Sequence, residues 1–221
     1  MLDLDLSSLF AGDAAPAADR TVRILTVCTG NICRSPLAAQ ILAARLADLD
    51  VVVASAGTRG LVDKPMTPEA LRLAAELGVD PATSAGHLAR WLNETHLDDV
   101  DLVLGMTREH RSAAVALAPA RTRAAFTSRE FARLADGVDD AAIARAADEA
   151  GDDPHARVRA ALALLSQRRG EAELPADPSD DDVVDPYRRS WDTYQLSARQ
   201  LMPGMDAVTR VIRAALSPCP R

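Results

Sequence analysis

One strand–loop–helix segment near the N-terminus constrains the fold of this chain more than any other feature. Residues 21–27, TVRILTV, form an apolar run rich in β-branched side chains, which is typical of a strand buried on both faces. The polar loop CTGNICRSP follows at residues 28–36, and apolar side chains then recur at helical spacing over residues 37–46. Ser35 is expected to cap this helix and Pro36 to occupy its first turn. The segment predicts the first unit of a parallel α/β sheet.

The alternation of strands and helices continues through residue 127. The pattern predicts strands at residues 51–55, 101–104 and 123–127, a helix over residues 67–77 closed by Gly78, and a helix over residues 107–119. Strands that alternate with helices form a parallel sheet covered on both faces. We therefore predict an α/β fold, a three-layer sandwich with a central, mainly four-stranded parallel sheet. Parallel sheets bind ligands at the carboxyl ends of their strands, so the loop after residue 27 lies where a site is expected.

The remaining segments differ in character. Residues 1–20, rich in Ala, Asp and Ser, are expected to be a mobile tail, and residues 21–217 to form a single domain. A helical insertion is expected at about residues 128–182, with three helices followed by a Pro- and Asp-rich loop. Such a long insertion can form a lid over the site, an oligomer contact or a decoration away from the site. Two further helices are predicted, one from residue 187 toward Arg199 and one over residues 206–216.

Composition excludes several classes of protein. Apolar residues make up 48% of the chain, enough to fill a core, and no apolar stretch is long enough to cross a membrane. The net charge of −7 argues against a general nucleic-acid binder. The acidic start MLDLDLSSLF lacks the features of a signal peptide, and three cysteines do not make a secreted disulfide framework. We expect a cytoplasmic protein without membrane insertion or a nucleic-acid partner.

The loop at residues 28–36 has the chemistry of an anion site with a nucleophile. A loop between a strand and a helix directs backbone N–H groups into a concavity. Gly30 and Asn31 tolerate the unusual backbone angles that this requires, and Arg34 offers a planar fork of donors for two phosphate oxygens. A helix N-terminus and a nearby arginine favour the reactive thiolate form of a cysteine such as Cys28. The loop is therefore expected to bind an oxyanion above an activated thiol.

With these residues the sequence resembles the low-molecular-weight protein tyrosine phosphatases, the acid phosphatase type I family. The family signature Cys-x5-Arg-Ser appears as CTGNICRSP, and a second signature matches Asp185-Pro186-Tyr187. The stretches SAGT at residues 55–58, GHLAR at 86–90 and DLVLGMTREH at 101–110 are also similar to the family. The resemblance covers about residues 21–127 and 183–216. It implies the phosphotyrosine protein phosphatase I-like fold and hydrolysis of phosphate monoesters, with a phosphotyrosine protein or a small phosphate monoester as substrate.

The resemblance also implies roles for particular residues. Cys28 would attack phosphorus and form a phosphocysteine, and Asp185 would act as general acid and then as general base, with Asp182 as the substitute candidate. Ser35 would donate to the Cys28 sulfur. No metal and no cofactor would be needed. The phosphate would be held by Arg34 and by the loop residues Thr29, Gly30, Asn31, Ile32, Cys33 and Ser35, with Asn31, Ser55 and His87 as a supporting hydrogen-bonded network.

The expected substrate pocket is less aromatic than the family pattern. Tyr187 would form one wall, but Arg188 follows it where a second aromatic is common in the family. Leu61 would form the opposite wall, where the family often has another aromatic. Protein arginine phosphatases share this fold and usually have threonine in place of Ile32, so the isoleucine favours the tyrosine-specific interpretation. The other histidines, His96, His110 and His155, are expected on surfaces.

Alternatives stay open at this point. Residues 56–218 contain no cysteine, which excludes the arsenate reductases that relay a disulfide through two further cysteines. An arsenate reductase that uses a small-molecule thiol, a protein arginine phosphatase and a non-catalytic phosphate-binding regulator remain alternatives. Cys33 can be a partner for a reversible disulfide with Cys28, as in the family, or a small loop filler.

Overall fold

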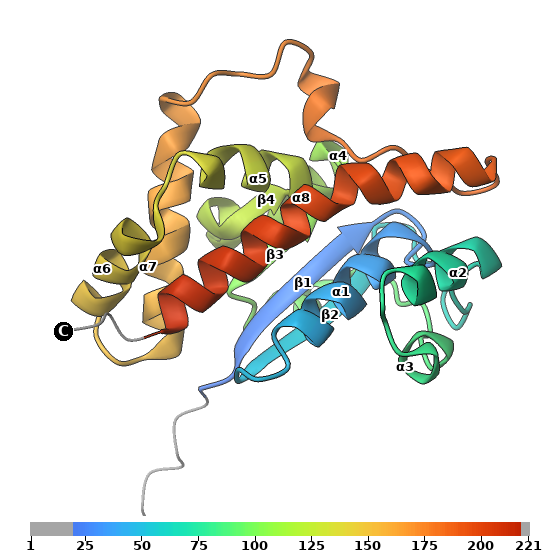
Figure 1. Ribbon diagram of the computed structural model, residues 1–221, viewed down its shortest axis with the longest axis horizontal. Helices are drawn as coiled ribbons and strands as arrows, with labels where there is room; N and C mark the ends of the chain where they lie inside the picture. The colour runs from blue at the N-terminus through green and yellow to red at the C-terminus, as the bar shows by residue number, and fades with distance from the viewer. Residues whose placement is uncertain (1–19, 218–221) are drawn as a thin grey trace, which may run out of the picture.

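The computed structural model describes residues 20–217. It has a parallel sheet of four strands, ordered β2-β1-β3-β4. The strands are β1 (Val22–Cys28), β2 (Val51–Gly57), β3 (Leu102–Gly105) and β4 (Ala125–Thr127). Residues 1–19, the expected tail except Arg20, lie outside the described residues. The predicted fold class, an α/β fold around a four-stranded parallel sheet, is confirmed (Figure 1).

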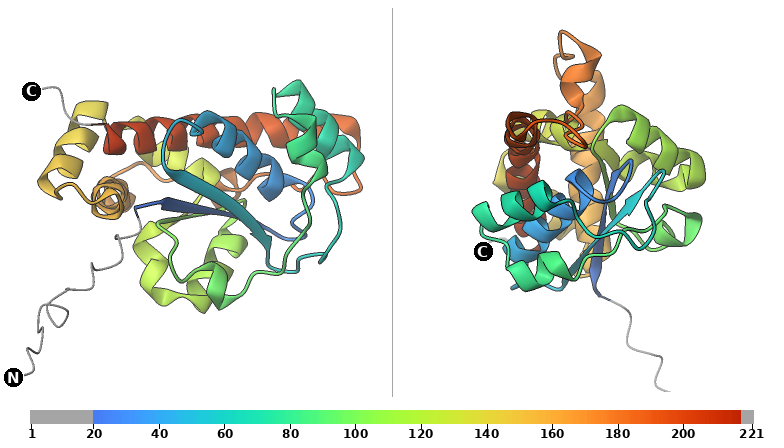
Figure 2. Two further views of the ribbon diagram at one scale, coloured as in Figure 1. Left: turned by 90° about the horizontal axis from the view of Figure 1, so that it is seen from below. Right: turned by 90° about the vertical axis from the view of Figure 1, so that its right-hand side faces the viewer.

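Two hydrophobic clusters, one on each face of the sheet, make three layers. Alternate residues of a strand point to opposite faces. Ile24 accordingly joins the cluster under α1 (Arg34–Arg45) and α8 (Trp191–Leu216), whereas Leu25 joins a smaller cluster that includes Ala114 of α4 (Arg108–Leu117). Figure 2 shows the sheet between these two layers of helices. Strands β1, β3 and β4 are buried nearly throughout, as their apolar sequences predict, whereas the edge strand β2 is partly exposed in its first half.

The shorter helices of the first half begin and end where the sequence predicts. Thr67 caps α2 (Pro68–Glu76) by accepting a hydrogen bond from the backbone N–H of Ala70, and Gly78 follows its end with a φ of +81°. The next helix is α3 (Pro81–Ala85). Thr107 caps α4 in the same way as Thr67 caps α2, and the 3-10 helix η3 (Pro119–Ala124) leads into β4.

The expected cap of α1 is wrong. The helix begins at Arg34, its flanking residue is Cys33, and no side chain caps it. Ser35 is the second helical residue, and its hydroxyl contacts the Cys28 sulfur and the Asn31 side chain instead. A Ser-Pro pair after a polar loop matches the usual start of a helix, but here the Ser35 hydroxyl forms hydrogen bonds with loop residues instead of capping the helix.

The C-terminal helix α8 is continuous, which corrects two expectations. It starts at Trp191 rather than directly after Tyr187, and it runs through Pro203 and Gly204, where the sequence predicts a break. Pro203 removes one intrahelical donor, but the apolar side chains on both sides of it lie on one buried face of the helix. Burial of that face outweighs the local preference to end the helix.

Gly204 marks the point where α8 crosses α5 (Ser128–Asp136). A Cβ atom at residue 204 would lie 2.6 Å from the backbone oxygen of Ser128. We expect Gly204→Ala to lower the free energy of unfolding by about 1–3 kcal/mol, because the crossing is overpacked despite the better helix propensity of alanine. Urea denaturation measures this change. Gly170→Ala is the control, since a Cβ there has no neighbour within 4 Å; equal stability of the two variants would contradict the prediction.

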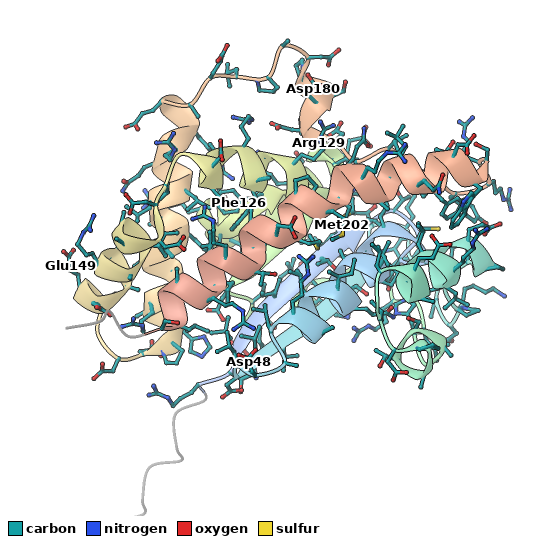
Figure 3. The ribbon with its side chains drawn as sticks, in the orientation of Figure 1. Asp48, Phe126, Arg129, Glu149, Asp180 and Met202 are labelled. Carbon is teal, nitrogen blue, oxygen red and sulfur yellow. The ribbon has the colours of Figure 1, made fainter. Side chains whose placement is uncertain are left out.

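The segment expected to be an insertion contains the three predicted helices, α5, α6 (Asp140–Glu149) and α7 (Pro154–Gln167), and then the short 3-10 helices η4 (Arg168–Gly170) and η5 (Pro178–Asp181). Helices α6 and α7 pack against α8, at the end of the molecule opposite the arrowheads of the strands (Figure 1). Glu149, at the end of α6, and Asp180, on η5, lie far apart in Figure 3.

Two side chains of α7 form polar contacts with other elements of the fold. His155 Nδ1 lies 2.9 Å from a carboxylate oxygen of the buried Asp101, which directly precedes β3. Arg157 Nε donates to the backbone oxygen of Ala215 in α8 at 2.8 Å. His155 is thus a half-buried partner of Asp101 and not the surface residue expected from the sequence. Helices α6 and α7 lie away from the carboxyl edge of the sheet, so they do not form the lid considered above.

Candidate functional site

A pocket of about 230 Å³ opens at the carboxyl edge of the sheet. Its floor is the loop between β1 and α1, and its rim includes Arg59 and Leu61, which follow β2. Asp185 and Tyr187 line it from the segment before α8. Residues more than 150 positions apart in the chain therefore meet around Cys28.

The Cys28 sulfur accepts hydrogen bonds from two donors. The Ser35 hydroxyl lies 3.0 Å from the sulfur, and the backbone N–H of Asn31 lies 3.3 Å from it. Donors that point at a sulfur stabilise its thiolate relative to its thiol. Cys28 is a free cysteine and is buried at the base of the pocket. The geometry suits a nucleophilic thiolate.

Asn31 holds the loop in shape. Its backbone is left-handed, with a φ of +57°, and its side chain is fully buried. The side-chain nitrogen donates to the hydroxyls of Ser35 and Ser55, each at 2.9 Å, and the side-chain oxygen accepts from the backbone N–H of Arg90. His87 Nε2 donates to the backbone oxygen of Asn31 at 2.7 Å. The structure thus brings together the predicted network of Asn31, Ser55 and His87.

His87 takes part in this network as a neutral donor. A carbonyl oxygen can only accept, so Nε2 must carry the proton. Burial lowers the pKa of His87, which keeps the ring uncharged at neutral pH.

Arg34 contacts residues 183–185 before α8, and one of its N–H groups has no hydrogen-bond partner among the described residues. Its side chain is 4% exposed, and one guanidinium nitrogen donates to the backbone oxygen of Val183 at 3.0 Å. The other terminal nitrogen lies 2.9 Å from a carboxylate oxygen of Asp185. The Nε atom is buried and has no hydrogen-bond partner among the described residues. A buried N–H without a partner is costly, so this donor at the pocket fits an oxyanion.

Asp185 is placed by two contacts. Besides its ion pair with Arg34, it accepts a hydrogen bond from the backbone N–H of Tyr187 at 3.2 Å. These contacts fix its direction, rather than the helix start that the sequence predicts, because α8 begins only at Trp191. Asp182, the substitute candidate, pairs with Arg108 and does not line the pocket.

The pocket walls carry the two predicted apolar residues and one residue that the sequence analysis missed. Leu61 and Tyr187 both line the pocket and are 41% and 37% exposed. Arg188 follows with a left-handed φ of +60°, and its guanidinium lies 5.1 Å from the centre of the Tyr187 ring. Arg59 also lines the pocket and is exposed. Because the chain contains many arginines, the residue type alone does not single out Arg59, and only its position in the structure shows that it lines the pocket.

His110 is a second residue that the sequence analysis misplaced. It is buried, 4% exposed, and not on a surface. Its Nε2 lies 2.9 Å from the Thr29 hydroxyl in the loop, and its Nδ1 lies 2.9 Å from the Thr107 hydroxyl. Burial and the nearby charge of Arg34 lower the pKa of His110 to about 4, so the ring is neutral at physiological pH. Its position in the first turn of a helix at the carboxyl edge of the sheet is the signal that could have identified it.

Cys33 lines the same pocket as Cys28, but its sulfur has different partners. Its sulfur is 3.5 Å from the Thr67 hydroxyl and 3.6 Å from the Tyr194 hydroxyl, and both loop cysteines are free thiols. Burial raises the pKa of the Cys33 thiol to about 11.

We therefore expect iodoacetamide to leave Cys33 unmodified at pH 7–8, because a raised pKa keeps it in the unreactive thiol form below about pH 11. Fragment-ion mass spectrometry of the peptide that contains both loop cysteines measures the label at each. Cys28 in the same peptide is the internal control. Equal labelling of Cys33 at pH 7 would contradict its burial.

Residues 20–217 contain no cluster of three or more His, Cys, Asp or Glu side chains that could hold a metal ion. Within the same part of the chain, no helix is both long and apolar enough to span a membrane.

Comparison with known proteins places the chain in a family. Residues 23–162 match the model of the low molecular weight phosphotyrosine protein phosphatase family. The low molecular weight protein-tyrosine-phosphatase Etp of Escherichia coli K12 is 44% identical over 96 residues, which are 43% of this chain and 62% of Etp. The protein-arginine-phosphatase of Geobacillus stearothermophilus is 35% identical over 115 residues, covering 52% of this chain and 74% of that protein.

A solved structure extends the comparison to the C-terminal half. The low molecular weight protein tyrosine phosphatase from T. tengcongensis superposes with a TM-score of 0.57 at 28% identity, covering 85% of this chain and 97% of that one. The curated match to Etp spans less than two thirds of Etp, whereas the structural match spans nearly the whole neighbour. The Cys-x5-Arg loop at residues 28–35, the order of the strands and the match to the family model all indicate the same family. The chain belongs to the low molecular weight phosphotyrosine protein phosphatase family.

Proposed function

We propose that the protein is a protein-tyrosine phosphatase that hydrolyses phosphate monoesters through a phosphocysteine on Cys28. The observation that carries the proposal is the buried Nε of Arg34, which has no hydrogen-bond partner among the described residues and belongs to a side chain that lines the same pocket as Cys28 and Asp185. A donor for a phosphate oxygen, a nucleophile and a proton source on opposite sides of one cavity are what the reaction requires.

The reaction has two steps. In the first, the Cys28 thiolate attacks phosphorus, the ester P–O bond breaks, and protonated Asp185 gives its proton to the leaving oxygen. In the second, the Asp185 carboxylate takes a proton from water as the water oxygen attacks phosphorus and the S–P bond breaks, which releases inorganic phosphate and restores the thiolate. Arg34 and the amides of Thr29, Gly30, Asn31, Ile32, Cys33 and Ser35 hold the phosphoryl oxygens throughout, so much of the catalysis is positioning and electrostatics.

Substrate choice follows from the pocket walls. Leu61 and Tyr187 line the pocket above the phosphate loop, and their apolar surfaces fit an aryl ring between them. Ile32 lines the same pocket and favours an aryl ester over phosphoarginine. The substrate is therefore a phosphotyrosine protein or a small aryl phosphate. The protein acts in the cytoplasm in this proposal, because the reaction needs Cys28 as a free thiol and cytosolic thiols are kept reduced.

Steady-state hydrolysis of p-nitrophenyl phosphate and phenyl phosphate under reducing conditions tests the proposal. Wild type is expected to turn over both, and Asp185→Asn to lower kcat for phenyl phosphate by about 10²-fold or more. The loss for p-nitrophenyl phosphate is expected to be smaller, because its better leaving group depends less on a proton. Asp182→Asn is the matched control and is expected to act as wild type. A phosphotyrosine and a phosphoarginine peptide of one sequence then separate the two specificities. No turnover of any monoester by wild type would overturn the proposed function.

A further inference from the structure

The chain of hydrogen bonds from Thr107 through His110 to Thr29 ends at the pocket. The Thr29 hydroxyl forms a hydrogen bond with His110 Nε2, and the tautomer of the ring decides which of the two is the donor. Thr29 also lines the pocket beside Cys28. His110 is buried and neutral, so it carries one ring proton, on either Nδ1 or Nε2. The position of that proton decides whether the Thr29 hydroxyl donates to His110 Nε2 or can donate to an acceptor in the pocket.

The Thr107 hydroxyl fixes the position of the proton. As the cap of α4, its oxygen accepts from the backbone N–H of His110. If Nδ1 accepts the Thr107 hydroxyl proton, that proton has a partner. If Nδ1–H donated instead, the Thr107 oxygen would receive two N–H groups and its own proton would have no partner among the described residues. The Nε2–H form instead leaves the Thr29 proton unpaired within the protein, but Thr29 lines the pocket and its hydroxyl gains an acceptor when an oxyanion binds there. With an oxyanion bound, only the Nε2–H form pairs both hydroxyl protons and the ring proton.

With the proton on Nε2, the ring donates to the Thr29 oxygen, and the Thr29 hydroxyl keeps its own proton for another acceptor. The opposite tautomer would take that proton and leave lone pairs of Thr29 facing the pocket, where they would repel an anion. The other charged groups that act on the ring are Arg34, Asp185 and Asp182, and burial together with Arg34 outweighs the two carboxylates. The ring therefore stays neutral over the range in which the enzyme would work.

We infer that His110 is a positioning residue that turns the Thr29 hydroxyl into a side-chain donor to an oxygen of the bound phosphoryl group. This inference rests on the proposed phosphatase function and adds a side-chain donor to the backbone amides of the loop. It gives a fixed role to a histidine that is neither a base nor a surface residue.

Kinetics with four variants test the inference. Thr29→Val keeps the shape of the side chain and removes the hydroxyl, and it is expected to lower kcat/KM for p-nitrophenyl phosphate by about tenfold or more. His110→Phe is expected to cause a similar loss, and the double variant to lose little more than either single variant, because both remove one hydrogen bond to substrate. His110→Gln can place an amide N–H near the Nε2 position, so it is expected to retain several-fold more activity than His110→Phe.

His155→Phe is the matched control for loss of a partly buried histidine. It breaks the pair with Asp101 at the other end of the sheet, so it is expected to lower the thermal midpoint without changing kcat/KM. Additive losses in the Thr29 and His110 double variant, or full activity of Thr29→Val, would overturn the inference. So would an equal loss of kcat/KM in His155→Phe, since destabilisation alone would then explain the effect.

Nitrogen NMR gives a readout that does not depend on turnover. A two-bond ¹⁵N–¹H correlation spectrum of histidine-labelled protein distinguishes the tautomers, and His110→Gln identifies the signals among the four histidines. In the presence of saturating inorganic phosphate, the Nε2–H form supports the inference and the Nδ1–H form overturns it. If wild type hydrolysed no monoester, the phosphatase proposal would fail separately. Calorimetric binding of inorganic phosphate, expected to be about tenfold weaker in Thr29→Val, would then decide the role of the hydroxyl.

Discussion

Replacing Cys28 with serine is expected to lower aryl phosphate turnover by roughly 10⁴-fold or more. Serine has nearly the same size, and Ser35 and the Asn31 amide can still donate to its oxygen as they do to the sulfur. Those donors stabilise an anion, but a serine hydroxyl hardly ionises at neutral pH, so the variant lacks the nucleophile. Steady-state kinetics measures the loss.

Phosphate binding is the control for this variant. Arg34 and the loop amides are unchanged in Cys28→Ser, so calorimetry is expected to give an affinity for inorganic phosphate within a few-fold of wild type. Loss of binding would mean that the loop had collapsed and that turnover could not be interpreted. More than about 1% residual turnover with intact binding would contradict Cys28 as the nucleophile.

Replacing Arg34 with lysine is expected to lower kcat/KM by about 10²–10³-fold although the positive charge is kept. The guanidinium donates to the Val183 carbonyl and to Asp185 with its two terminal nitrogens, and Nε is left for the substrate. The ammonium group of a lysine lies at the end of a flexible chain and cannot donate to the Val183 carbonyl, Asp185 and the substrate with the same geometry. The expected pattern is a large loss of kcat/KM together with weaker binding of inorganic phosphate.

Arg59→Lys is the matched control for this substitution. Arg59 is exposed at the pocket rim, and no hydrogen bond or ion pair fixes its guanidinium among the contacts described above. The same chemical change there is expected to alter kcat/KM by no more than about threefold, as for an exposed charge. A loss at Arg34 no larger than at Arg59 would contradict the role of the planar fork.

The sheet and its loop could be predicted because local sequence decides them. The apolar run of β1, the Gly-Asn pair and the following helix pattern are contiguous, and their positions in the structure differ from prediction by only a few residues. The supporting trio of Asn31, Ser55 and His87 came from resemblance and meets in the structure. The functional roles of these three residues remain predictions.

Long-range packing decided what the sequence analysis missed. Pro203 is a strong local signal for a helix end, yet the buried face of α8 carries the helix through it. The position of His110 in the first turn of a helix could have placed it near the site, but its partner Thr29 is 81 positions away and could not be read from the sequence. The Val183 carbonyl, which holds Arg34, is a backbone group and has no sequence signature at all.

The contact between Arg34 and residues 183–185 also has a consequence for the order in which the protein matures on the ribosome. Strands β1 to β4 and the phosphate loop are complete by residue 127, but Asp185 and the docking helix α8 are synthesised more than 50 residues later. The nascent chain would hold Cys28, the proposed nucleophile, well before it holds Asp185, the proposed general acid. Closure of this long loop is entropically slow relative to local contacts. If the proposed function holds, activity is therefore expected to appear only after α8 has been synthesised and docked, so this helix determines when the site is completed.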